Sequence, residues 1–67
     1  MEYIDINKKV PTKNQKGYEI KTNKGIEYEA EYDKGIFYKL PMNTQIGWKN
    51  PFGDEYEVVT HWRYAQT

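Results

Sequence analysis

No cysteine occurs in this chain of 67 residues, so neither a disulfide nor a cysteine-ligated zinc site can support its fold. Histidine is scarce as well: His61 stands alone, and it would need several converging carboxylates to hold a metal ion. We therefore expect no metal and no cofactor. The chain is instead rich in aromatic residues. It has seven tyrosines, two tryptophans and two phenylalanines, which can build a core. Its length predicts one domain over residues 1–67, near the lower size at which a chain folds alone.

Neither sign of charge is in excess. Ten basic residues balance ten acidic ones, so no long-range field draws nucleic acid or anionic lipid to the protein. No apolar run is long enough to span a membrane, and the N-terminus lacks the basic and apolar regions of a signal peptide. These absences predict a cytoplasmic protein without a membrane partner.

Apolar and polar residues alternate with period two over 17–22, 26–32 and 36–40, which predicts antiparallel strands. The segments between them are Asn23-Lys24-Gly25 and Asp33-Lys34-Gly35. Both have the chemistry of a three-residue hairpin loop that ends in a glycine with left-handed backbone. The sequence therefore predicts a three-stranded meander.

The loops also predict the register of the strands. Thr22 should pair with Ile26 in the first hairpin, and Tyr32 with Ile36 in the second. A charged face then includes Phe37 opposite Glu31, and a slip of one residue would bury the glutamates. The predicted apolar face consists of Tyr18, Ile20, Tyr28, Ala30, Tyr32, Ile36, Tyr38 and Leu40.

A fourth strand is expected over 56–64, and a short edge strand near 2–6. In the fourth strand the alternate residues that are more aromatic should face the core, which leaves His61 and Arg63 facing solvent. This more aromatic set consists of Tyr56, Val58, Thr60, Trp62 and Tyr64.

The segment 41–50 shows no period and is predicted to be a loop, although a short helix within 5–16 or 41–50 stays open. The predicted fold is all-β, or nearly so. It is a small antiparallel meander of four to five strands, in a curled sheet or half-barrel.

Short motifs along the chain give a family resemblance. They are Tyr3-Ile4, Val10-Pro11, the segment from Tyr32 to Phe37, and the motif Val59-Thr60-His61-Trp62. With these, the chain resembles the family known as domain of unknown function 551, short proteins frequent in bacteriophages and prophages. It departs from the family at Tyr3, where tryptophan is usual, and after the terminal motif, where Leu-Pro usually follows. The resemblance covers most of the chain and implies a phage or prophage origin, but no activity, because the family has none assigned.

His61 is the residue type whose charge ordinarily changes near neutral pH. A catalytic role would require a positioned partner. Thr60 should not supply it, because adjacent residues of a strand point to opposite faces. We therefore expect a histidine that is hydrogen-bonded to backbone or solvated, and no enzymatic activity.

Phe37 has two interpretations on the predicted charged face. It is either an exposed contact for a partner or is covered by segment 41–50 through Trp48, and we favour the cover. The predicted interaction surface comprises Phe37, Trp48, His61, Trp62 and Arg63.

The leading functional hypothesis is a non-enzymatic phage or prophage accessory protein that binds a host or phage protein, for which an exposed sheet edge offers one route. The first alternative is weak binding of single-stranded nucleic acid by the lysine-rich segment 8–16 and the C-terminal rings. Zero net charge and the acidic stripe of Glu27, Glu29 and Glu31 argue against it. The last alternative is a small enzyme that uses His61. Both a monomer and a homodimer stay open.

Overall fold

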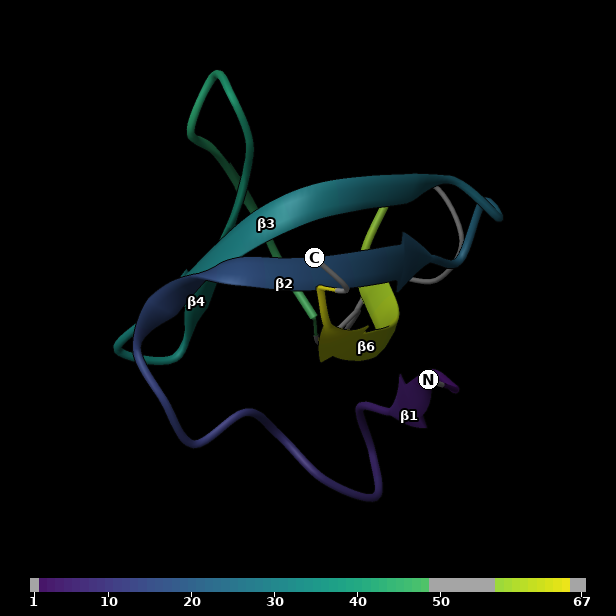
Figure 1. Ribbon diagram of the computed structural model, residues 1–67. Helices are drawn as coiled ribbons and strands as arrows, with labels where there is room; N and C mark the ends of the chain where they lie inside the picture. The colour runs from purple at the N-terminus through teal and green to yellow at the C-terminus, as the bar shows by residue number, and fades with distance from the viewer. Residues whose placement is uncertain (1, 49–56, 66–67) are drawn as a thin grey trace.

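The computed structural model describes residues 2–48 and 57–65. This described part consists of strands, turns and loops without a helix, which confirms the predicted fold class (Figure 1). The strands form one six-stranded antiparallel sheet in the order β1-β6-β2-β3-β4-β5. They are β1 (Ile4–Asp5), β2 (Gln15–Thr22), β3 (Glu27–Asp33), β4 (Ile36–Lys39), β5 (Thr44–Ile46) and β6 (Val59–Tyr64).

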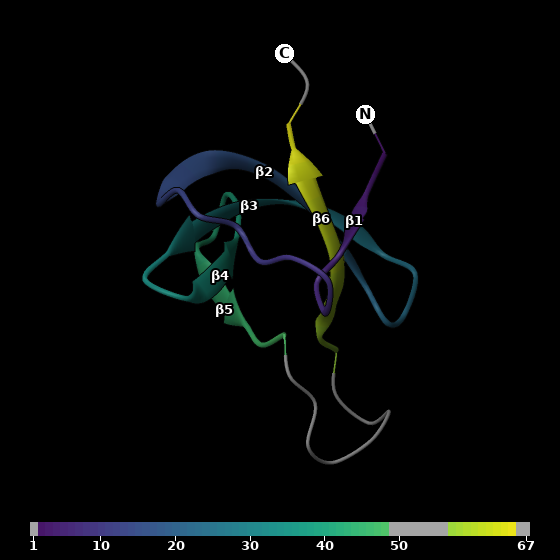
Figure 2. The same cartoon turned by 90° about the horizontal axis from the view of Figure 1, so that it is seen from below.

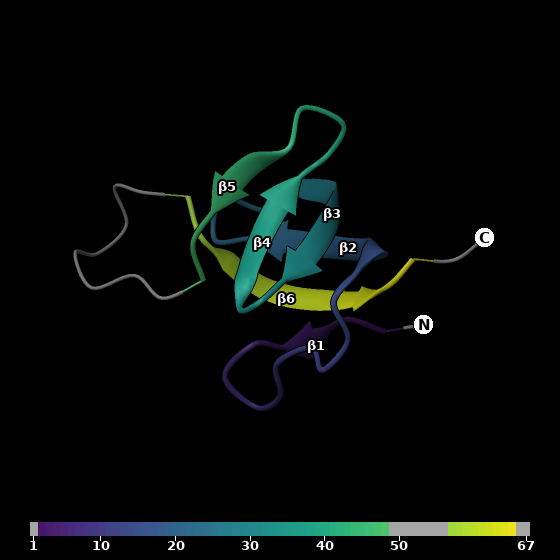
Figure 3. The same ribbon diagram turned by 90° about the vertical axis from the view of Figure 1, so that its left-hand side faces the viewer.

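The sheet curls strongly, so that β4 runs across β2 in the view of Figure 3, but it does not close into a barrel. One backbone hydrogen bond bridges the gap: the N–H of Val59 donates to the carbonyl of Gly47 at 2.8 Å. Next to it, the N–H of Ile6 donates to the carbonyl of Thr60 at 2.9 Å, and β1 lies beside β6 (Figure 2). Both ends of the sheet are therefore fastened to the start of β6.

The first predicted hairpin is confirmed. The N–H of Thr22 donates to the carbonyl of Ile26 at 3.0 Å, and Lys21 lies opposite Glu27. Gly25 has a φ of +77°, the left-handed conformation that the three-residue loop requires.

The predicted register of the second hairpin is wrong by one residue. Asp33 pairs with Ile36, so the loop consists of Lys34 and Gly35 alone. Their φ angles of 50° and 86° are both positive, as a two-residue type I′ turn requires. The side chain of Asn14 supports this turn, because its Oδ1 accepts a hydrogen bond from the N–H of Lys34 at 3.0 Å.

A shift of one residue moves every side chain of β4 to the other face. Phe37 is therefore completely buried opposite Tyr32, with the ring centroids 4.9 Å apart. The prediction that Phe37 lies on the charged face is wrong, and so is its interpretation as an exposed contact. The predicted loop 41–50 is partly wrong too, since β5 pairs with β4 and places the buried Ile46 opposite Phe37.

A bulge at Thr60 sets the faces of β6. Lys21 of β2 lies opposite His61, whereas the next residue, Thr22, lies opposite Val59, so Thr60 is the extra residue. The bulge allows both Val59 and Trp62 to be buried. The prediction that Trp62 faces the core is thus confirmed. The prediction that Val58 faces the core is wrong, because Val59 is the more buried of the two valines. The expected start of the strand at Tyr56 lies outside the described residues.

Buried rings with polar tips form the centre of the core. The ring of Tyr18 lies 5.6 Å from that of Trp62, and both are fully buried. Their polar tips are satisfied by backbone: the hydroxyl of Tyr18 donates to the carbonyl of Lys13, and Nε1 of Trp62 donates to the carbonyl of Lys9, each at 2.8 Å. These bonds hold the segment between β1 and β2, which was predicted as loop, against the core.

We expect Phe37→Ala to unfold most of the protein, because removing a buried phenylalanine costs about 3–5 kcal/mol. A core in a chain of this size rarely supplies more than about 3–5 kcal/mol of net stability. Tyr38→Ala should remain folded, since Tyr38 lies on the opposite face of β4. Dispersion of the amide resonances in NMR spectra measures both outcomes. Equal effects of the two substitutions would contradict the register of β4.

Candidate functional site

The structure divides the predicted interaction surface in two. Phe37 and Trp62 are completely buried and so do not contribute to any exposed surface. Trp48, His61 and Arg63 are half-buried at the surface. The prediction of Trp62 as a surface contact is wrong. An aromatic residue in a half-buried strand fits both the core and the surface, so the sequence pattern does not distinguish them.

Trp48 and His61 line the same depression, which has a volume of about 480 Å³. Its lining includes Ile6, which directly follows β1, and Val59, at the start of β6. The indole of Trp48 packs against the core, and its Nε1 donates to the carbonyl of Gly35 at 2.9 Å. Residues from the two ends of the curled sheet thus meet in one place.

His61 is held by its neighbour in the chain, contrary to expectation. Nδ1 of His61 lies 2.9 Å from the hydroxyl oxygen of Thr60. The bulge makes this contact possible, because it rotates Thr60 out of the regular alternation of the strand. The hydroxyl of Thr60 also donates to the carbonyl of Lys21 at 3.2 Å. That bond uses the hydroxyl proton, so Thr60 is not poised as a nucleophile that His61 could deprotonate.

Tyr3 joins the site from the N-terminal end, although it was not part of the predicted interaction surface. Its hydroxyl donates to Oε1 of Glu27 at 2.6 Å, and the guanidinium carbon of Arg63 lies 4.2 Å from its ring centroid. Arg63 in turn donates from Nε to Glu19 at 2.7 Å, and this bond raises the pKa of Arg63. The contacts hold Tyr3 and Arg63 in fixed positions on the outer face of β6.

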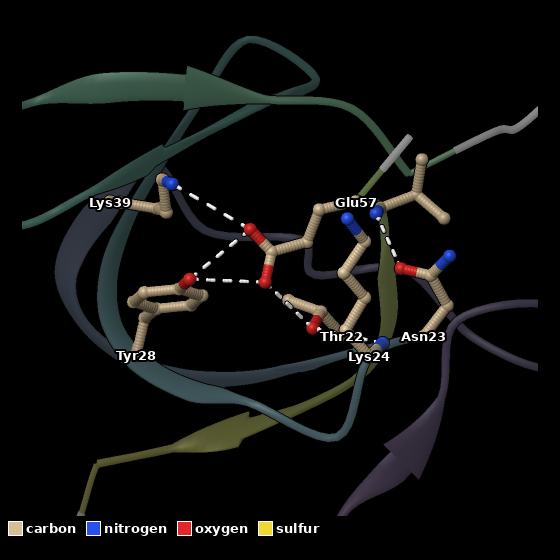
Figure 4. A network of polar contacts seen from close by, with 7 residues as sticks. Thr22, Asn23, Lys24, Tyr28, Lys39 and Glu57 are labelled. Carbon is tan, nitrogen blue, oxygen red and sulfur yellow. Dashed lines mark hydrogen bonds and ion pairs between the residues drawn. The ribbon is translucent and has the colours of Figure 1, made fainter. Parts of the chain in front are cut away.

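A second polar cluster lies on the concave side of the sheet, around the carboxylate of Glu57 (Figure 4). Thr22 donates its hydroxyl to this carboxylate at 2.9 Å, and Tyr28 donates at 3.0 Å. Nζ of Lys39 lies 3.8 Å from the same group and 4.7 Å from the ring centroid of Tyr28. Partial burial, and then the bond with Glu57, raises the pKa of Tyr28. The cluster links the segment before β6 to β2, β3 and β4, so we interpret it as structural.

Lys39 and Glu57 were not predicted to meet. The predicted register placed Lys39 on the charged outer face, whereas the observed register turns it inward. Glu57 carries no local signal for this role, because its partners are distant in the sequence.

The described ranges hold no group of three or more histidine, cysteine, aspartate or glutamate side chains arranged to bind a metal ion. Nor does this part of the chain contain a helix with the length and apolar character needed to cross a bilayer.

Tyr3 should ionise at unusually high pH. Burial, and then the hydrogen bond to Glu27, raises its pKa from the ordinary 10.0 to about 12. The folded state therefore holds this proton more tightly than the unfolded state does. Its contribution to stability is complete below pH 10 and is lost as the pH rises towards about 12. Denaturant unfolding at several alkaline pH values should show a shallower loss for Tyr3→Phe than for the wild type, and identical slopes would contradict the assignment.

Replacing Glu57 with alanine should destabilise the protein by about 1–3 kcal/mol, because the hydroxyls of Thr22 and Tyr28 would lose their acceptor in a partly buried site. Glu29→Ala is the matched control, since Glu29 is exposed on the outer face of β3, and it should change stability by less than about 0.5 kcal/mol. Urea unfolding followed by tryptophan fluorescence measures both. Similar losses for the two variants would show that the cluster contributes nothing specific.

Comparison with known proteins adds no identification. Neither a family model, nor a curated protein, nor a solved structure matches the chain. The resemblance indicated by the motif Val59-Thr60-His61-Trp62 therefore stays a prediction.

Proposed function

We propose that the protein is a non-enzymatic protein-binding module of phage or prophage type, whose contact surface is centred on His61. We call this the β6 surface and define it as Tyr3, Trp48, His61 and Arg63. The observation that supports it most is the position of His61, which shares one depression with Trp48 and another with Tyr3.

The residue types of the β6 surface favour a protein partner. Tryptophan, tyrosine and arginine are the residues most enriched among those that dominate binding energy at protein interfaces. Each of them is also held before any partner arrives: Trp48 by Gly35, Tyr3 by Glu27, and Arg63 by Glu19. Side chains that are already ordered lose less conformational freedom on binding, which favours affinity.

The alternatives find less support. The enzymatic alternative depends on His61, whose nearest hydroxyl, that of Thr60, is committed to the carbonyl of Lys21. The nucleic-acid alternative needs a basic surface, but Arg63 is paired with Glu19, and Glu27 lies beside Tyr3. A protein partner accommodates this mixture of charges better than a phosphate backbone does.

The experiment is an affinity capture from bacterial lysate with the tagged protein, with and without nuclease, followed by calorimetry with the purified captured protein. His61→Ala and Trp48→Ala should each weaken binding, and truncation of a central tryptophan typically costs at least about 2 kcal/mol. Tyr38→Ala, on the outer face of β4, is the control and should bind like the wild type.

Two other results of the capture experiment would contradict the proposal. Loss of the captured material after nuclease treatment would favour the nucleic-acid alternative. Full affinity in the His61→Ala and Trp48→Ala variants would place the contact elsewhere on the molecule and refute the β6 surface. Folding of each variant is checked by its NMR spectrum, because Trp48 also packs against the core.

A further inference from the structure

A second depression lies beside His61, on the outer face of β2 and β6. It has a volume of about 480 Å³, and its lining includes Tyr3, Lys21, Asn23 and Thr60. Among the described residues this lining holds no carboxylate. It differs in this respect from the depression shared with Trp48, which Asp5 lines.

Lys21 supplies a positive charge that is not engaged in an ion pair within the described residues. Arg63, on the same face, is paired with Glu19 at 2.7 Å. In residues 2–48 and 57–65, by contrast, no carboxylate oxygen lies within 4.0 Å of the ammonium of Lys21. The ring of Tyr3 lies beside this ammonium, with its centroid 5.8 Å away. Glu27, which lies opposite Lys21 on β3, instead accepts the hydrogen bond from Tyr3.

The hydrogen bonds around His61 show which of its ring nitrogens is engaged and which has bonding capacity to spare. The hydroxyl proton of Thr60 goes to the carbonyl of Lys21, so the oxygen of Thr60 accepts from Nδ1–H of His61. Nε2 then has no hydrogen-bond partner in the part of the chain that the structure describes. Lys21 and His61 are direct partners across β2 and β6, and the Cβ atoms of such a pair lie about 4.5–5.5 Å apart.

We propose that Lys21 and His61 form a binding site for a small oxyanion, a phosphate or carboxylate group. The ammonium of Lys21 and the Nε2–H of a protonated His61 would donate to the same anion, and charge-assisted bonds of this kind are the stronger hydrogen bonds in proteins. The site goes beyond the proposed protein contact, because it binds a free anion and requires no partner.

Binding should strengthen as the pH falls, because Nε2 donates only when His61 carries its second proton. The charged groups that face His61 from the neighbouring strands are Asp5 of β1 and Lys21 of β2. Asp5 lines the other depression, and its Oδ1 accepts a hydrogen bond from the N–H of Asn7 at 2.9 Å. The nearest uncharged polar group is the hydroxyl of Thr60.

The test uses the fact that the chain has one histidine, so a single imidazole signal in the NMR spectrum reports on the site. The protein is titrated at matched ionic strength with sodium phosphate, sodium acetate and sodium chloride. Phosphate, acetate or both should shift the His61 signal to saturation, more strongly at low pH, and chloride should not. The anion that saturates identifies the chemical source, a phosphate or a carboxylate.

Lys21→Met should weaken the binding about tenfold, which corresponds to loss of one charge-assisted hydrogen bond. Lys24→Met is the matched control, because Lys24 lies in the adjacent hairpin loop and does not line the depression. Its affinity should equal that of the wild type. His61→Gln, followed through the amide signals of residues 21–23, should remove the pH dependence.

Equal, unsaturated shifts with all three salts would overturn the proposal, as would equal weakening in Lys21→Met and Lys24→Met. Lys21 and Lys24 are exposed, so neither substitution disturbs the core. A negative result here leaves the protein-binding proposal standing, since that proposal is measured by its own capture and calorimetry.

Discussion

Burial of Tyr18 and Trp62 is the constraint on which the rest of the structure depends. A chain of this size depends on these two large rings for the apolar area of its core, and both are fully buried. Each ring also carries a donor, a hydroxyl in Tyr18 and an N–H in Trp62, that needs an acceptor when it is buried. The carbonyls of Lys13 and Lys9 supply these acceptors. The segment between β1 and β2 must therefore cross the core, and it carries β1 to its place beside β6. Two hydrogen bonds to buried rings here fasten a long connection that a disulfide often secures in other small domains.

The bulge at Thr60 in β6 affects both the core and the outer surface of the sheet. Because Thr60 is an extra residue in β6, Val59 and Trp62 both point inward. The bulge also brings the hydroxyl of Thr60 to His61 and so fixes the imidazole. A strand without the bulge would have to give up either the buried valine or the held histidine. The proposed functional surface is thus a consequence of how the core is filled.

The first hairpin has the three-residue loop that the Asn23-Lys24-Gly25 pattern predicts. Asp33-Lys34-Gly35 has the same pattern but forms a two-residue loop, because this pattern fits both lengths. The shorter loop allows burial of Phe37 and the approach of Lys39 to Glu57. No local pattern reports such contacts. For the site, three of the five predicted residues, His61, Trp48 and Arg63, lie at the surface, whereas Phe37 and Trp62 are buried. The predicted surface did not include Tyr3 and Lys21. Lys21 reaches His61 through the pairing of β2 with β6, and Tyr3 reaches the site through the pairing of β1 with β6, so both depend on residues far apart in the chain.

The hydrogen bond between Gly47 and Val59 has a consequence for how the fold tolerates change in length. It holds together two points of the backbone, on β6 and just after β5, that are well separated in the sequence. A loop whose ends are fixed in this way can be lengthened at little cost, since each doubling of its length adds only about 0.6 kcal/mol of closure entropy. This position is therefore the natural one for evolution, or an engineer, to add new chain without disturbing the strands.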